Sequence, residues 1–249
     1  MNLNFSFLSK YFPMFINGSK TTLILSLTTV IIGMFFGVIL AVMRLSKFYP
    51  LSFLSRKKGK NAPFYAKFNP VSFVSAAYVE FVRGTPLMVQ IFFVFYALPQ
   101  MGFRIPNISG LGFDFPRFAS GIIALGLNSA AYIAEIVRAG IQAVDHGQTE
   151  AALSLGMNKW QTMKNVVLPQ AFKNILPALG NEFVTLIKES SIVMVIGITE
   201  LMFNTSQVYS SSYRYFESLI VAAVIYFTMT FTTSRLIGVL EGRMRASES

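Results

Sequence analysis

Residues 21–43 read TTLILSLTTVIIGMFFGVILAVM and contain no charged side chain. A bilayer core of about 30 Å is crossed by about 20 apolar helical residues, which rise 1.5 Å each. This stretch is therefore long enough to span a membrane, and Lys20 and Arg44 bound it. Gly33 and Gly37, one helical turn apart, predict a face on which another helix packs closely.

The composition of the whole chain agrees with a membrane protein. Of its 249 residues, 53% are hydrophobic and 13% are charged, whereas about 25% of the residues in soluble domains are charged. The formal net charge is +10, but nucleic-acid-binding domains are seldom so apolar, and we expect no nucleic-acid partner. The absence of Cys and the single histidine, His146, exclude disulfides, thiolate nucleophiles and a histidine-based zinc site. We therefore assign no metal site and no catalytic residue.

Four further apolar stretches predict helices that cross the bilayer. The fourth span is interrupted by Glu182, Lys188 and Glu189, and charges at membrane depth are costly and therefore informative. Together the stretches predict an all-α integral membrane protein with five transmembrane helices. The predicted spans cover residues 21–43, 84–103, 118–138, 174–199 and 217–236. In the second of them, Thr85 and Pro86 predict a helix start, with Thr85 as N-cap.

The distribution of cations predicts the orientation of these spans. Of the 21 Lys and Arg residues, fifteen lie in the loops on one side, five lie on the other, and Lys188 lies within a span. Since cytoplasmic loops are rich in Lys and Arg, we expect the N-terminus outside and the C-terminus in the cytoplasm of a multi-pass protein of the cell (inner, cytoplasmic) membrane. The net charge of +10 is thus explained by the concentration of Lys and Arg in the loops predicted to be cytoplasmic.

The regions outside the spans divide into four segments. Residues 1–18 predict an amphipathic segment on the extracytoplasmic surface, and residues 19–240 form the transmembrane domain. Within that domain, the basic, proline-containing residues 44–70 predict a cytoplasmic linker that contacts anionic lipid headgroups. The cytoplasmic loop covers residues 139–173, and residues 241–249 form a cytoplasmic tail.

The cytoplasmic loop predicts two short helices. Asp145 is placed to cap the start of the first helix, and Gly156 is typical of the residue just past its end. Asn158 repeats the start signal, and Pro169 is expected to stop the second helix. Apolar residues at helical spacing give each helix a face to bury, and packing under the membrane domain would also explain them.

Seven residues of this loop form a motif with fixed spacing. Glu150-Ala151-Ala152, Gly156, Val166, Leu168 and Pro169 resemble the EAA motif of ABC importer permeases, with Val166 in place of Ile as the one departure. The stretch from Glu80 to Pro86 and the residues around the motif look like the polar amino acid subfamily, which includes histidine, glutamine, arginine and cystine permeases. The resemblance covers about residues 19–240.

The resemblance implies a type I ABC importer permease and its partners. These partners are a cytoplasmic ABC ATPase dimer, a second permease subunit that is identical or paralogous, an extracytoplasmic solute-binding protein and a polar amino acid, with glutamine the first expectation. ATP and Mg belong to the ATPase, because this chain has no phosphate-binding loop, and we expect it to bind no cofactor. The implied ATPase-coupling residues are Glu150, Ala151, Ala152, Leu155, Gly156, Met157, Asn158, Val166, Leu168 and Pro169.

Polar residues within the spans are candidates for the substrate pathway. They fall at helical spacing in the third and fourth spans and are expected to face a bundle interior or a watery cavity. Equally, Lys188 pairing with a carboxylate, and Glu135 pairing with Arg138, would only stabilise the bundle. The candidate residues are Asn128, Tyr132, Glu135, Asn181, Glu182, Thr185, Lys188 and Glu189.

Two rival functions remain. A secondary amino acid transporter or channel driven by an ion gradient would explain the interrupted fourth span and the buried carboxylates. A membrane scaffold that transports nothing is the other. Neither explains the motif in the cytoplasmic loop.

Overall fold

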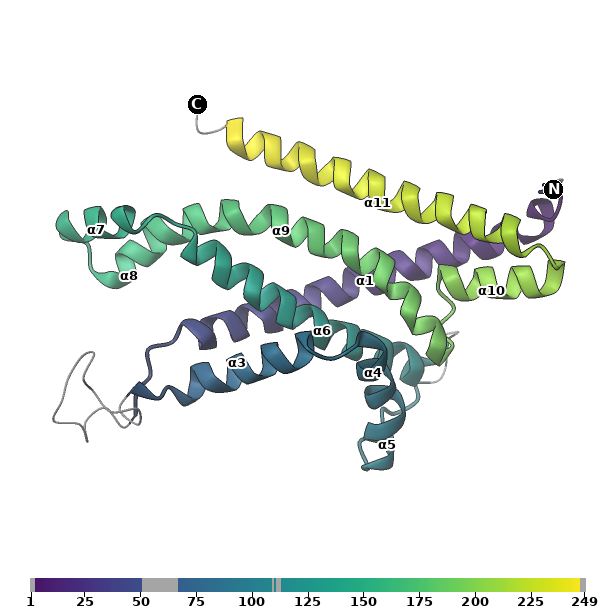
Figure 1. Ribbon diagram of the computed structural model, residues 1–249, viewed down its shortest axis with the longest axis horizontal. Helices are drawn as coiled ribbons and strands as arrows, with labels where there is room; N and C mark the ends of the chain where they lie inside the picture. The colour runs from purple at the N-terminus through teal and green to yellow at the C-terminus, as the bar shows by residue number, and fades with distance from the viewer. Residues whose placement is uncertain (1–2, 51–66, 109, 111–112, 247–249) are drawn as a thin grey trace.

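The computed structural model describes residues 3–50, 67–108, 110 and 113–246, and every regular element among these residues is helical (Figure 1). The all-α fold class is confirmed for this part of the chain. Most of the predicted linker and the last three residues of the tail lie outside the described residues. The first half contains α1 (Leu8–Leu45), α3 (Pro70–Arg83), α4 (Leu87–Phe92), the π-helical η3 (Phe93–Ala97), α5 (Leu98–Gln100) and α6 (Phe115–Gln142).

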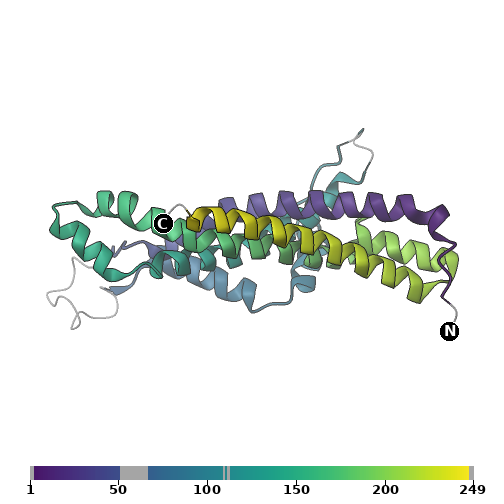
Figure 2. The same cartoon turned by 90° about the horizontal axis from the view of Figure 1, so that it is seen from above.

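The longest helices run along the long axis of the molecule (Figures 1 and 2). The second half contains α7 (His146–Ser154), α8 (Lys159–Thr162), the π-helical η4 (Met163–Val167), α9 (Leu168–Glu189), the 3-10 helical η5 (Ser190–Ile196), α10 (Leu201–Ser212) and α11 (Tyr215–Ala246). The helices α1, α6, α9 and α11 form the bundle. The pair α7 and α8 lies at one end, and α10 lies with the N-terminus at the other (Figure 1).

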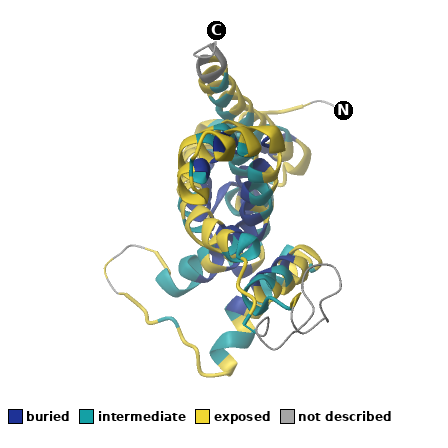
Figure 3. Ribbon diagram, turned by 90° about the vertical axis from the view of Figure 1, so that its left-hand side faces the viewer, coloured by how far each residue is buried: buried dark blue, intermediate teal, exposed yellow. Residues whose placement is uncertain are grey.

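Among the described residues, three helices are long and apolar enough to cross a bilayer by themselves. They are α1, α6 and the Tyr215–Gly242 part of α11, and the bent pair α3 and α4–α5 adds a fourth if it counts as one span. The fourth predicted span corresponds to α9, whose apolar run is interrupted by Glu182, Lys188 and Glu189. Within an apolar stretch of 18 residues in each helix, 67% of the residues of α6 are buried by the rest of the chain, but only 6% of those of α11 are. Figure 3 shows this contrast between a buried interior and an exposed rim.

The contact between α1 and α6 depends on the two glycines of the first span. A Cβ atom at Gly33 would lie 2.9 Å from the Ser129 hydroxyl oxygen, and one at Gly37 would lie 2.7 Å from the Ile133 side chain. Ile133 is fully buried in a cluster with Val137 and other apolar residues of α1, α6 and α9. The predicted small-residue face is therefore confirmed as the packing surface for α6.

The first span is longer than expected. Residues 1–18 were expected to lie as a separate segment on the membrane surface, but α1 runs without a break from Leu8 to Leu45. Its 38 residues measure about 57 Å. A tertiary contact explains the extra length of the helix, because Phe15 is fully buried in a cluster with Leu201 and Val208 of α10. Packing against α10 thus continues the helix of the first span through this segment.

The second span differs most from its prediction. Residues 70–83 already form α3, and the chain then bends by 106° before α4 begins. Thr85 is not an N-cap: its hydroxyl donates back to the carbonyl of Phe81 (3.0 Å), and Pro86 is the residue that precedes α4. Because proline lacks an N–H and disfavours helical geometry at the residue before it, Pro86 ends α3 and starts a new direction.

Pro169 does not stop a helix. It is the second residue of α9, and α8, η4 and α9 follow one another without an intervening loop. The π-helical turn η4 ends at Val167, two residues before this proline, and such turns accommodate local disruptions of the α-helical hydrogen-bond ladder. The expected second short helix is therefore the start of a long one.

Candidate functional site

The pair α7 and α8 is shaped by capping interactions that the sequence predicts. The Asp145 carboxylate accepts a hydrogen bond from the Gly147 N–H (2.7 Å) at the start of α7. At the start of α8, the Asn158 side chain accepts from the Gln161 N–H and the Gln161 side chain accepts from the Asn158 N–H, both at 2.9 Å. This reciprocal capping box satisfies backbone donors that a helix leaves free.

The turn between the two helices depends on a left-handed residue. Gly156 has φ +85°, its N–H donates to the Leu153 carbonyl (3.0 Å), and the Met157 N–H donates to the Ala152 carbonyl (3.1 Å). These two bonds form a Schellman motif, which fixes how a helix ends. A Cβ atom at Gly156 would meet nothing within 4 Å, so glycine is favoured there by backbone conformation.

The same two helices have an apolar surface turned outward. Ala152 and Val167 are buried and hold α7 against η4, whereas Leu155 is 83% and Trp160 is 70% exposed. The expectation that both helices bury one apolar face is met in part, since the described residues leave Leu155 and Trp160 largely uncovered. Of the remaining motif residues, Glu150, Ala151, Asn158, Leu168 and Pro169 are exposed, and Met157 and Val166 are half-buried.

The polar residues of α6 have different partners. Asn128 is buried, and its side-chain amide donates to the Gln90 side-chain oxygen (3.0 Å). Gln90 in turn donates to the carbonyls of Val82 (2.7 Å) and Thr85 (3.1 Å) at the bend between α3 and α4. Gln90 therefore bonds the backbone carbonyls at the bend, and Asn128 holds the Gln90 side chain in place. Gln90 was not among the predicted site residues.

One turn further along α6, charged groups gather around Tyr132. The Arg83 guanidinium lies over the Tyr132 ring, 5.4 Å from its centroid. Glu135 and Arg138 form an ion pair, with the Arg138 Nε atom 3.1 Å from both carboxylate oxygens. The predicted pairing of these two residues is confirmed, and Arg83 lies beside the third span although the charge count placed it in a cytoplasmic loop.

The polar residues of α9 divide between two environments. The Ser129 hydroxyl of α6 donates to the Glu182 carboxylate (2.8 Å), so this pair links α6 to α9. Thr185 and Glu189 are half-buried, whereas Asn181 and Lys188, two turns apart, are both exposed. The structure therefore brings Glu182 to the third span but leaves Asn181 and Lys188 open.

A buried carboxylate at the other end of the bundle was missed. Glu200 is fully buried, and it accepts hydrogen bonds from the N–H groups of Met202 (2.8 Å) and Phe203 (2.6 Å) and from the Tyr226 hydroxyl (2.8 Å). It caps α10 and connects it to α11. The N-cap position was a possible signal, but the tyrosine lies 26 residues away. Among the described residues, no three His, Cys, Asp or Glu side chains are grouped as metal ligands would be.

Comparisons with known proteins give consistent results. Residues 62–246 match the family described as binding-protein-dependent transport system inner membrane component. The chain is 36% identical to the arginine transport system permease protein ArtQ of Bacillus subtilis, covering 100% of both chains. It is 35% identical to the putative glutamine transport system permease protein GlnP of Rickettsia felis, covering 96% of this chain and 98% of that one.

Solved structures show the same fold. A crystal structure of an amino acid ABC transporter with histidines contains a chain that is 43% identical, with a TM-score of 0.82, covering 98% of this chain and 100% of that one. A chain of the MetNI methionine ABC transporter in an inward-facing conformation has a TM-score of 0.62 at 17% identity, covering 91% and 95% of the two chains. At that identity the second match bears on the fold alone.

Proposed function

Because the chain belongs to the family of binding-protein-dependent transport system inner membrane components, we propose that it is the permease subunit of an ABC importer that carries a polar amino acid into the cytoplasm. The family membership makes it a multi-pass inner membrane protein with a type I ABC permease-like fold. Relatives named for arginine and for glutamine transport support an amino acid as the solute.

The exposed apolar surface of α7 and α8 carries the proposal. Leu155 and Trp160 project from two helices that their own caps hold in place, and soluble partners commonly bury such exposed aromatic and aliphatic anchors. A separate ATPase dimer, which binds ATP and Mg, is the partner that fits this surface. The end with α7 and α8 then lies in the cytoplasm, and the N-terminus and α10 lie outside.

Alternating access requires that this contact move the bundle. The helix α8 is continuous with α9 through η4, and α7 packs against η4, so a rigid-body displacement of the docked surface is transmitted to the fourth span. A second permease subunit, identical or paralogous, completes the pathway, and an extracytoplasmic solute-binding protein delivers the amino acid at the α10 end.

The candidate pathway residues now divide into two groups. Asn128, Glu135 and Glu182 have partners within this chain, and we assign them to stabilising the bundle. Tyr132, Asn181 and Lys188 are exposed, and Thr185 and Glu189 are half-buried, which leaves these five accessible to a solute that crosses between two permease subunits.

The test is uptake by vesicles that contain the assembled complex. We expect uptake of a radiolabelled amino acid that requires ATP, the ATPase and the solute-binding protein, together with ATP hydrolysis that substrate-loaded binding protein stimulates. Uptake that continues without ATP or the ATPase would instead support an ion-gradient-driven transporter or channel. Absence of any uptake and of stimulated hydrolysis would support a scaffold.

A further inference from the structure

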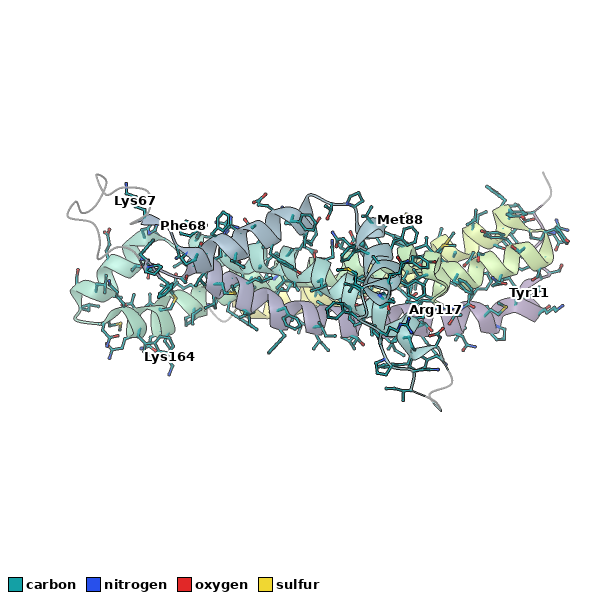
Figure 4. The ribbon with its side chains drawn as sticks, turned by 90° about the horizontal axis from the view of Figure 1, so that it is seen from below. Tyr11, Lys67, Phe68, Met88, Arg117 and Lys164 are labelled. Carbon is teal, nitrogen blue, oxygen red and sulfur yellow. The ribbon has the colours of Figure 1, made fainter. Side chains whose placement is uncertain are left out.

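A small cavity lies where α6 begins and η5 ends. Its volume is about 220 Å³, and the side chains of Asp114, Arg117, Phe113 and Phe118 line it together with the backbone of Gly197. Arg117 lies in the half of the molecule that carries Tyr11, away from Lys164 of η4 (Figure 4). The cavity is therefore on the side of the molecule opposite to the proposed ATPase-docking surface.

Two opposite charges face each other in this cavity. The Asp114 carboxylate caps α6 by accepting from the Arg117 N–H (3.1 Å), and its second oxygen lies 3.3 Å from the Arg117 Nε atom. Although this distance makes an ion pair, the Nε atom is buried and has no hydrogen bond of good geometry. The other end of the guanidinium donates to the Gly197 carbonyl through a long contact of 3.4 Å. Of the Arg117 donors, Nε thus has no hydrogen bond and Nη1 has only a long one, while the side chain as a whole is 40% exposed.

The backbone at Gly197 makes room for the guanidinium. Gly197 has φ +80°, and a Cβ atom there would lie 2.5 Å from the Arg117 Nη1 atom. Glycine at this position therefore permits the close approach of the Arg117 guanidinium to the turn. On the other side, the rings of Phe113 and Phe118 meet edge to face at 5.1 Å and form an apolar wall. Charge, an apolar wall and a fixed backbone all meet in one small volume.

We propose that this cavity binds a free α-amino acid, with Arg117 binding the carboxylate and Asp114 the ammonium group. A zwitterion can replace each half of the Asp114–Arg117 pair, so neither charge is left unpaired when the ligand enters. A lone anion or a lone cation would pair with one residue and leave the other without its partner. The cavity is smaller than the pockets of drug-sized ligands, which suits a single amino acid with its side chain against Phe113 and Phe118.

The site deepens the proposed function and rests on it, because an importer meets its solute first on this side. The cavity touches Gly197–Thr199, which connect η5 to the buried cap residue Glu200. An amino acid bound here therefore contacts the connection between the fourth span and α10. We assign the cavity to the first contact of the released amino acid with the permease.

The test measures binding to the complete transporter in lipid nanodiscs without the solute-binding protein. The probes are L-glutamine and L-arginine, with agmatine, which lacks the carboxylate, and N-acetylarginine, which lacks the ammonium group. The variants are Arg117→Gln and Asp114→Asn, because Asn retains the acceptor that caps α6. Arg104→Gln removes a nearby arginine outside the cavity and is the matched control. Calorimetric titration is expected to show at least tenfold weaker binding of one or both amino acids to both cavity variants.

The control Arg104→Gln is expected to bind the amino acids with wild-type affinity. Agmatine and N-acetylarginine are each expected to bind the wild type at least tenfold more weakly than L-arginine does. The two cavity variants are expected to retain the wild-type unfolding temperature. Unchanged amino acid affinity in Arg117→Gln and Asp114→Asn would overturn the proposal, as would the absence of binding to the wild type. If ATP-dependent uptake persisted in those cases, the proposed function would stand and only this site would be rejected. Loss of ATP-dependent uptake in the wild type would reject the function itself.

Discussion

The two ends of the molecule are built alike but held together differently. At the α7–α8 end, a short helix is fixed by caps and a Schellman turn formed by residues close in sequence, and Leu155 and Trp160 remain exposed. At the α10 end, a short helix rests on α1 and α11, and its apolar residues Leu201 and Val208 are fully buried. Local hydrogen bonds maintain the first end, and long-range burial maintains the second.

This difference indicates how the two ends are used. An element shaped by its own caps keeps its form while its apolar side chains stay free for a partner. An element that buries its apolar side chains within its own chain depends on the rest of the fold and changes shape only with it. We therefore expect substitutions at the α10 end to reduce stability and substitutions at the α7–α8 end to reduce association with the ATPase.

The largest effect is expected for Glu200→Ala. This change removes the acceptor of two backbone N–H groups and of the Tyr226 hydroxyl in a fully buried site, and we expect a loss of about 3–5 kcal/mol in the free energy of unfolding. Denaturation of the purified protein in detergent measures it. Tyr226→Phe removes a single hydrogen bond and is expected to cost about 1 kcal/mol. Equal stability of Glu200→Ala and the wild type would show that the carboxylate does not hold α10.

The next effect separates the two ends by function. Leu155→Asp places a charge on the exposed surface of the α7–α8 turn, and we expect at least tenfold weaker binding of the ATPase, with stability unchanged within about 0.5 kcal/mol. Titration of the ATPase against the permease in nanodiscs measures the affinity. Tyr213→Asp is the matched control, because Tyr213 is 84% exposed at the α10 end. If both variants bound the ATPase like the wild type, the apolar surface would have no role in docking.

A smaller effect is expected where the turn itself is changed. Gly156→Val forces a β-branched residue into a left-handed conformation, which costs about 1–2 kcal/mol. We expect the turn to rearrange and less ATPase to co-purify, while membrane insertion is unaffected. Gly238→Ala is the control, since this glycine lies in α11 with open space around it and alanine favours a helix. If as much ATPase co-purified with Gly156→Val as with the wild type, the geometry of this turn would not be required for docking.

The smallest effect concerns the cap of α8. Asn158→Ala removes one half of the capping box, with an expected cost of about 0.5–2 kcal/mol confined to the start of this helix. Hydrogen exchange at the amides of residues 159–162 is expected to accelerate, while amides of α10 keep their protection. Asn158→Ser retains an acceptor and is expected to exchange nearly like the wild type. Equal exchange in all three proteins would mean that contacts with η4 hold α8.

The sequence predicted the parts of the fold that local interactions determine. Asp145, Gly156 and Asn158 have the expected roles, because a cap is formed by residues within four positions of one another. Gly33 and Gly37 likewise mark the packing face, since small residues at helical spacing permit close approach. The Glu135–Arg138 pair lies within one helical turn and was equally accessible to sequence reasoning.

The remaining features depend on contacts between distant residues. Pro86 and Pro169 look alike in sequence, yet one lies at a bend of 106° and the other lies in the first turn of α9, after a π-helical turn. The difference lies in their surroundings, including the Gln90 side chain that bonds the free carbonyls beside Pro86. Glu200 shows the same limit, because its partner Tyr226 comes from another helix. Charge spacing alone also placed Arg83 in a loop, although α3 brings it to Tyr132.

The most direct test uses the absence of cysteine from the chain, which makes any introduced cysteine unique. Leu155→Cys and Tyr213→Cys place one thiol on each exposed end, and a thiol-specific photo-crosslinker is attached to each purified variant before it is assembled with its partners. We predict that Leu155→Cys crosslinks to the ATPase and that Tyr213→Cys does not. Crosslinking of the ATPase to Tyr213→Cys, or its absence from Leu155→Cys in a complex that hydrolyses ATP, would contradict the assignment of α7 and α8 as the docking surface.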